Sequence, residues 1–142
     1  MKSALYPTLC LLITAQVACA LPLRDECSSD ADCGGECVRT GECVAPGTAV
    51  AYRINWTIDG QPASDEACLA IAELSVTLQD SRQGDEVIYR PVTCSIGTFF
   101  FDRMPPRLDR VQVIAHGDGR LQLDRQTASL VAGGEVTVDL RL

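Results

Sequence analysis

The chain has 142 residues, of which 22% are charged and 46% hydrophobic, and its formal net charge is −7. This length suits one small domain with an appendage and excludes a large two-lobed enzyme. The excess of 19 acidic over 12 basic residues repels phosphate backbones, so we expect no nucleic-acid partner. No apolar run reaches the length of a transmembrane helix.

Residues 1–20 have the composition of an export signal. Lys2 supplies a positive charge, residues 4–18 are mainly apolar, and Ala18-Cys19-Ala20 matches an A-x-A cleavage site. We therefore predict a mature chain that begins at Leu21, with 11 basic and 19 acidic residues and a net charge of −8.

A second processing route is open at the same position. Val17-Ala18-Cys19 resembles the end of a bacterial lipobox, although Gln16 stands where an aliphatic residue is usual. This resemblance implies a lipid on Cys19 and an outer-membrane or cell-surface location, whereas cleavage after Ala20 gives a periplasmic or secreted soluble protein. The chain has eleven arginines and one lysine, and this composition favours a bacterial source.

Residues 21–45 form a cysteine-rich segment. Cys27, Cys33, Cys37 and Cys43 follow the spacing C-x5-C-x3-C-x5-C. The stretch has almost no aliphatic side chains and cannot bury a core, so crosslinks or a metal must order it. Disulfides are favoured over zinc because no C-x2-C knuckle occurs and exported thiols oxidise. Three pairings of the four cysteines are open.

Acidic side chains in this segment offer an alternative role. Asp30 and Asp32 alternate like ligands of a hard-cation loop, and Glu36 lies nearby, so these three are the candidate calcium ligands. The chain lacks a complete EF-hand series, which favours solvated turn acids instead.

The pattern C…DxDC…G…C…C from Cys27 to Cys43 resembles short cysteine-rich modules of secreted and lipid-anchored bacterial proteins. More distantly, it is similar to Dickkopf-like segments of animal proteins. The resemblance implies an extracytoplasmic spacer or interaction knob and carries no ligand with it.

Residues 46–142 are predicted to form an all-β domain, preceded by a boundary at Ala45-Pro46-Gly47. Apolar and polar residues alternate in short segments, as expected of strands with one buried face: 50–58, 73–79, 111–116, 121–124 and 136–142. Two further segments, 87–93 and 96–101, are rich in β-branched and aromatic residues.

Seven or eight short strands without interleaved long helices predict an antiparallel, Ig-like β-sandwich. The one helical candidate is 64–72, which Ser64 could cap and which would have two turns at most. Cys68 and Cys94 are expected to form a disulfide that closes a loop of about 27 residues and stabilises the fold by roughly 3–4 kcal/mol.

The order of features in the domain resembles a known family. Trp56, the two cysteines, Gly97-Thr98-Phe99 and Met104-Pro105-Pro106 occur in the sequence of the transthyretin-like and carboxypeptidase-regulatory-like sandwiches of bacterial surface lipoproteins. The corner at Met104-Pro105-Pro106 lacks the glycine and tyrosine usual there. The resemblance implies a non-catalytic accessory domain.

Catalytic and cofactor-binding motifs are missing from the sequence. His116 is the single histidine, which excludes multi-histidine metal centres, and without a G-x-S-x-G motif we expect it in a solvent-facing turn beside Gly117-Asp118-Gly119. No glycine-rich phosphate loop occurs, so no cofactor is expected. Phe100, out of phase with Phe99 and Phe101, is the candidate for an exposed apolar contact.

These observations leave three function classes. We favour a non-enzymatic, exported β-sandwich that acts in surface structure or protein interaction, because crosslinks and strand alternation account for nearly every unusual residue. The alternatives are a carbohydrate- or calcium-binding module and a small hydrolase inhibitor. The expected partner is a protein or a glycan.

Overall fold

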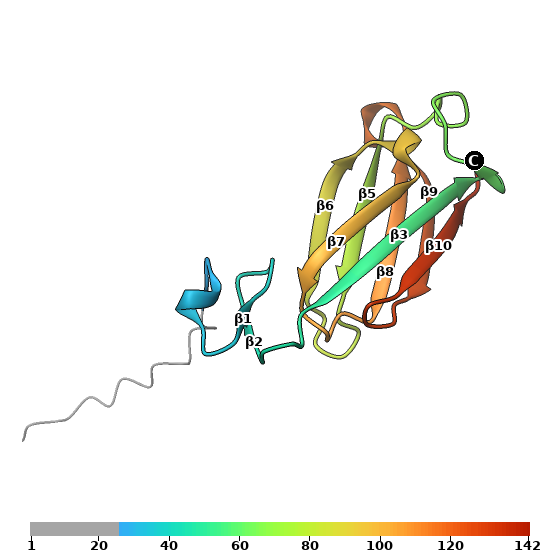
Figure 1. Ribbon diagram of the computed structural model, residues 1–142. Coiled ribbons are helices and arrows are strands. Elements are labelled where there is room, and N and C mark those ends of the chain that lie inside the picture. Colours follow the sequence, from blue (N-terminus) through green and yellow to red (C-terminus); the bar gives the residue numbers. More distant parts are fainter. Residues whose placement is uncertain (1–25) are drawn as a thin grey trace, which may run out of the picture.

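The computed structural model describes residues 26–142, which form a small cysteine module followed by a β-sandwich (Figure 1). The predicted export signal at residues 1–20 and the lipidation site at Cys19 lie outside the described residues. Between residues 26 and 142, no helix is long and apolar enough to cross a membrane.

The cysteine module, residues 26–44, combines a single 3-10 turn with a two-stranded ribbon. η1 spans Asp30–Asp32, and β1 (Glu36–Cys37) pairs antiparallel with β2 (Cys43–Val44). Val38 is the single buried hydrophobic side chain within these described residues. Crosslinks rather than a core therefore order the module, as the sequence predicts.

The sandwich consists of two sheets that face each other. In the first sheet, β3 lies between β10 on one side and β7 with the short β4 on the other. The second sheet has the order β6-β5-β8-β9. The strands span Val50–Ile58 (β3), Gln61–Pro62 (β4), Glu73–Gln79 (β5), Glu86–Val92 (β6), Thr98–Met104 (β7), Arg110–His116 (β8), Gln122–Ser129 (β9) and Glu135–Leu140 (β10). Single 3-10 turns lie at Cys94–Ile96 (η2) and Asp118–Arg120 (η3).

The predicted all-β sandwich with antiparallel sheets and a disulfide-rich N-terminal segment is confirmed. One pairing differs, because β10 runs parallel to β3, with Glu135 opposite Arg53 and Leu140 opposite Ile58. This parallel pair joins the first long strand to the last one. Alternation along a strand identifies its buried face but does not specify its neighbour.

The core lies between the inner faces of the two sheets and follows the predicted alternation. Buried side chains come from the predicted parity of three strands: Tyr52, Ile54, Trp56 and Ile58 of β3, Leu74, Val76 and Leu78 of β5, and Val111, Val113 and Ala115 of β8. Two buried side chains of this core carry polar groups, and both groups are hydrogen-bonded. The Tyr52 hydroxyl donates to the Leu108 carbonyl at 2.8 Å, and Trp56 Nε1 donates to the Cys94 carbonyl at 2.7 Å.

Two side chains expected to face solvent are instead buried. Ser75 and Thr77, on the outer face of β5, are each only 5% exposed. Thr77 lies opposite Ile88 of β6, and Ser75 lies opposite Ile114 of β8. Because β5 is flanked on both sides, its small side chains lie between larger neighbours and are covered by them.

Residues 64–72 do not form the predicted helix. Ser64 acts as expected at the start, since its Oγ accepts the Ala67 N–H at 3.1 Å and its carbonyl accepts the Cys68 N–H at 3.0 Å. The segment then continues as tight turns, with the Ile71 N–H bonded to the Cys68 carbonyl. Cys68 is crosslinked and Ile71 is buried, so the chain turns to place both side chains in the core.

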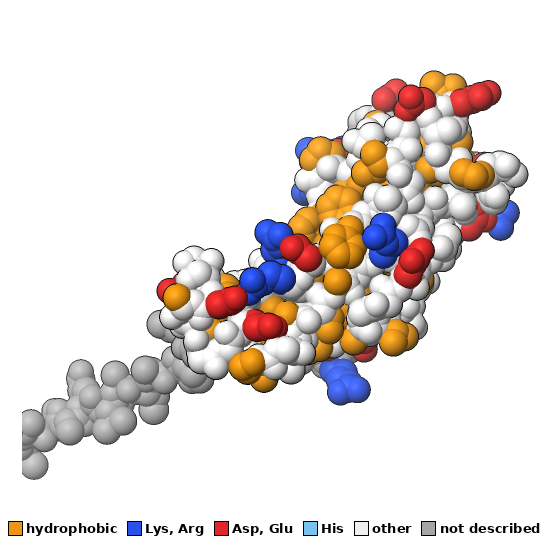
Figure 2. Space-filling view, in the orientation of Figure 1, with side chains coloured by type: hydrophobic (Ala, Val, Ile, Leu, Met, Phe, Trp, Pro, Cys, Tyr) orange, Lys and Arg blue, Asp and Glu red, His pale blue; other side chains and the backbone are white. Residues whose placement is uncertain are grey.

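The cysteine module is docked against the lower end of β7 through ion pairs and backbone contacts. Arg39 donates through Nε and Nη2 to the two carboxylate oxygens of Asp102, both at 2.9 Å, and its N–H donates to the Arg103 carbonyl at 2.8 Å. Arg103 in turn binds the Cys37 carbonyl and the Asp30 carboxylate. Figure 2 shows acidic and basic side chains gathered where module and sandwich meet.

A second set of contacts holds the other side of the module. Arg107 donates to Glu42 of the module at 3.0 Å and also lies 3.4 Å from Asp80 and 3.3 Å from Asp85 of the sandwich. Single exposed ion pairs contribute only up to about 1 kcal/mol. The docking of the module therefore depends on the network as a whole.

Candidate functional site

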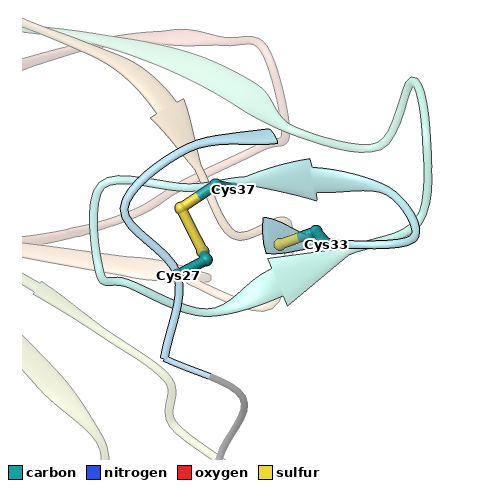
Figure 3. A group of neighbouring side chains, drawn as sticks. All are labelled: Cys27, Cys33 and Cys37. Atoms are coloured by element: carbon teal, nitrogen blue, oxygen red, sulfur yellow. A yellow bond between two sulfur atoms is a disulfide. The ribbon is translucent and has the colours of Figure 1, made fainter. Parts of the chain in front are cut away.

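The four cysteines of the module form two disulfides. Cys27 pairs with Cys37 and Cys33 with Cys43, each with a Cα–Cα distance of 5.7 Å. This selects one of the three pairings that the sequence left open. Figure 3 shows Cys33 beside the Cys27–Cys37 bridge.

The sulfur atoms of Cys27, Cys33 and Cys37 lie within 4.8 Å of one another, a spacing that could hold a metal ion. Zinc requires thiolates, and these sulfurs are bonded in disulfides, so the module is crosslinked rather than metal-bound. The predicted pair Cys68–Cys94 is also bridged, with a Cα–Cα distance of 5.9 Å. It joins the 63–72 loop to η2.

Asp30 and Asp32, two of the candidate calcium ligands, each satisfy local donors. The Asp32 carboxylate accepts four hydrogen bonds, from the N–H and the hydroxyl of both Ser28 and Ser29, which hold the pKa of Asp32 below its usual range. Asp30 accepts the Cys37 N–H at 2.8 Å, and this bond, with that from Arg103, lowers the pKa of Asp30.

The third candidate, Glu36, accepts the Ala49 N–H at 3.0 Å and fastens the linker to β1. Among the residues that the structure describes, Asp30, Asp32 and Glu36 are not brought together within ligating distance of one another. Their geometry gives the calcium hypothesis no support and assigns them to turn and linker structure.

His116 does not lie in a solvent-facing turn, so that prediction is wrong. It is the last residue of β8, half-buried, and its Nε2 lies 2.9 Å from the Ser75 hydroxyl. The strand extends through His116 because it pairs with Glu73 of β5 and Gln122 of β9. His116 Nδ1 has no hydrogen-bond partner among residues 26–142, so the pair lacks the orienting acid of a catalytic triad.

The outer face of β7 carries an exposed aromatic ring. Phe100 is 55% exposed, whereas Phe101 is buried and Phe99 packs against the core, as the phase of the three residues predicts. Arg53 of β3 lies opposite Phe100, with its guanidinium carbon 5.4 Å from the ring centroid. Figure 2 shows apolar side chains along this face, flanked on both sides by basic and acidic side chains. An aromatic ring beside an arginine is typical of protein interaction surfaces.

On the inner side of β7, three rings occupy the opening between the two sheets. Tyr89 of β6 has its ring centroid 4.8 Å from that of Phe101 and 5.8 Å from that of Phe99. Burial raises the pKa of the Tyr89 hydroxyl, which therefore stays neutral near pH 7. A cavity of about 220 Å³ adjoins these rings and reaches Arg39 and Asp102.

We name this region the β7 site and define it by seven residues: Arg39, Arg53, Tyr89, Phe99, Phe100, Phe101 and Asp102. The sequence identified Phe100 through its phase. It did not identify Arg39, Arg53, Tyr89 or Asp102, because their proximity depends on strand register and on docking of the module. The alternating pattern of β3 places Arg53 on the outer face but does not show that it lies opposite Phe100.

Comparisons with known proteins identify no family for this chain. No protein-family model and no curated protein matches it. Among solved structures, it is similar to a leucine-rich repeat protein from Bacteroides thetaiotaomicron VPI-5482, with 10% identity and a TM-score of 0.30. The match covers 71% of this chain but only 14% of that protein, and a TM-score this low carries no argument about fold or function.

Proposed function

We propose that this protein is an exported, non-enzymatic β-sandwich that acts as a protein-interaction module through the β7 site. Three disulfides in a small domain support an oxidising, extracytoplasmic location. Membership of the transthyretin-like accessory sandwiches is part of this proposal, and the two-sheet architecture supports it.

The observation that carries the proposal is the exposure of Phe100 on an edge strand beside an arginine. Phe, Tyr and Arg are enriched in interface cores, and a few such residues supply most of the binding energy. Natural edge strands are usually shielded by charge, bulges or covering segments. Here the module covers the lower end of β7 at Arg103 and leaves the stretch around Phe100 open.

The experiment replaces Phe100 with a photoreactive phenylalanine analogue in the full chain, expressed with its leader in its native organism. The matched control carries the analogue at Ile88, which is similarly exposed (51%) on the outer face of the other sheet. We expect one dominant crosslinked protein from position 100 and none from position 88.

The crosslinked protein is then identified, produced recombinantly and titrated against purified variants. Burial of the exposed half of Phe100 corresponds to about 2 kcal/mol, so Phe100→Ser should weaken binding at least tenfold while Ile88→Ser should not. Equal affinities of the two variants would refute the assignment of function to the β7 site.

The proposed location has a separate test, the intact mass of the exported protein. A start at Leu21 supports a soluble product, and a diacylglyceryl-type increment on Cys19 supports a lipid-anchored one. Retention of residues 1–20 would contradict export by either route.

A further inference from the structure

We infer that the open edge of β7 binds an extended, acidic segment of a partner protein as an added β-strand. This inference rests on the proposed function and specifies how the β7 site is used. It combines three features: unpaired backbone groups, a cavity beside them that is lined partly by aromatic rings, and an arginine that forms no ion pair within residues 26–142.

The direction of the backbone groups follows from the register of β7 on β3. The Trp56 N–H donates to the Gly97 carbonyl at 3.0 Å, so this pair is hydrogen-bonded. The following pairs along the strands are Asn55 with Thr98, Ile54 with Phe99 and Arg53 with Phe100. Hydrogen-bonded and non-hydrogen-bonded pairs alternate in an antiparallel ladder. The N–H and C=O groups of Thr98 and Phe100 therefore point away from β3.

No strand in the described part of the chain pairs with β7 on that open side. The open stretch has a defined lower limit, because the Arg39 N–H occupies the Arg103 carbonyl and the Arg39 side chain lies on Asp102. Unpaired edge groups of this kind bind extended peptides through main-chain hydrogen bonds. The added strand would thus cover Thr98 to Phe100 and end against the cysteine module.

Side chains of an added strand would alternate between two different surfaces. Those on the outer side would pack beside Phe100, and those on the inner side would face the cavity of about 220 Å³ between β6 and β7. Tyr89, Phe99 and Phe101 contribute aromatic rings to the lining of that cavity, against which an apolar side chain can pack, and the rest of the lining comes from Phe100, Met104, Arg39 and Asp102. The partner segment is therefore apolar at alternate positions.

The charges of the β7 site indicate which side chains the partner segment carries at its outer positions. Arg39 is neutralised by Asp102, whereas Arg53 stacks on Phe100 and is absent from the ion pairs found among residues 26–142. Glu135 of β10 lies opposite Arg53 in register, but its carboxylate accepts a hydrogen bond from the Asn55 side chain at 2.6 Å. An acidic side chain beside Phe100 could reach the Arg53 guanidinium across the ring. The outer positions of the partner segment are therefore acidic.

A second copy of this chain fits the edge less well. Two-fold antiparallel pairing centred on Phe100 would bring Thr98 of the second copy onto Asp102, where the Arg39 side chain already lies. We therefore assign the edge to a different protein.

The experiment uses two capped seven-residue peptides, one alternating valine with glutamate and one alternating valine with lysine, and the purified mature chain. Binding is measured by NMR titration, together with hydrogen exchange of the Thr98 and Phe100 amides. We expect at least tenfold tighter binding of the glutamate peptide and at least tenfold slower exchange at both amides. N-methylation of the peptide on the edge-facing residues should abolish binding.

Two charge reversals serve as matched variants. Arg53→Glu should reverse the preference between the peptides, and Arg125→Glu, on the opposite sheet, should leave it unchanged. Equal binding of both peptides, binding that survives N-methylation, or no binding at millimolar concentration would each overturn the inference. Protection of the two amides that rises with protein concentration alone would identify a second copy as the occupant and also overturn it.

The outcome separates this inference from the proposed function. If Phe100→Ser weakens partner binding but neither peptide adds to the edge, the function stands and strand addition is wrong. If the peptides bind as expected but Phe100→Ser leaves the partner's affinity unchanged, the edge is a peptide site and the functional assignment is wrong.

Discussion

Removal of the Cys68–Cys94 disulfide should strongly destabilise the sandwich. The two cysteines are 26 residues apart, and both side chains are buried in the core. In the chain-entropy model, a crosslink that closes a loop of about 27 residues stabilises the folded state by roughly 3.5 kcal/mol. Domains of this size have a total stability of only about 5–15 kcal/mol.

The test compares Cys68→Ala/Cys94→Ala with the parent protein by urea unfolding followed by circular dichroism. Alanine avoids burying a new polar group. With a slope of about 2 kcal/mol/M, the midpoint should fall by nearly 2 M. A loss below about 1 kcal/mol would refute the reasoning, because the unfolded chain would then gain little freedom from the missing crosslink.

The matched control removes the Cys33–Cys43 bridge, which closes a shorter loop with a separation of 10 residues. This bridge lies in the cysteine module, outside the sandwich core, so Cys33→Ala/Cys43→Ala should loosen the module and lower the main transition by less than about 1 kcal/mol. An equal drop in both double variants would show that module and sandwich unfold as one unit.

Three further outcomes are expected. Tyr52→Phe leaves the buried Leu108 carbonyl without its 2.8 Å donor and should lower the free energy of unfolding by about 1–2 kcal/mol in urea, and an unchanged value would contradict this contact. The pKa of Asp80 is held below its usual range, first by the Arg82 N–H and also by Arg107. A carboxylate whose pKa is lower in the folded than in the unfolded state stabilises the protein at pH values above its unfolded pKa, and it loses that contribution as the pH falls through its folded pKa. The urea midpoint of the parent protein should therefore decrease when the pH is lowered below about 4. The decrease should be smaller in Asp80→Asn, which has no carboxylate at this position. Iodoacetamide should label no cysteine of the unreduced, denatured mature protein, and one labelled cysteine would disprove the scheme of three bridges.

The sequence predicts the strands well because a strand with one buried face shows apolar and polar residues in alternation, with a period of two residues. The parity of β3 from Tyr52 to Ile58 and that of β8 from Val111 to Ala115 were both assigned correctly. The 64–72 segment was not, because a crosslink and a buried isoleucine there outweigh a helix cap. His116 was misplaced for a related reason, since neighbouring strands extend β8 beyond the point where its own pattern ends.

The candidate site was predicted only in part. The phase of Phe100 is a local property that the sequence contains directly. The positions of Tyr89, Arg53 and Arg39 around it depend on contacts with segments 11, 47 and 61 residues away in the chain, on other strands and in the cysteine module, and no local pattern encodes those contacts. The two disulfides of the module show the same limit, since any four cysteines allow three pairings and only the folded geometry selects one.

The parallel pairing of β10 with β3 has a consequence for the order of events during biogenesis. A chain that emerges with its N-terminus first delivers β3 early, but the strand that completes its sheet contains Glu135–Leu140 and arrives last. The first sheet therefore lacks one neighbour of β3 until a segment 82 residues further along the chain is available, since Glu135 pairs with Arg53 and Leu140 with Ile58. A contact of this sequence separation forms slowly, because a long loop must close before the pairing stabilises it.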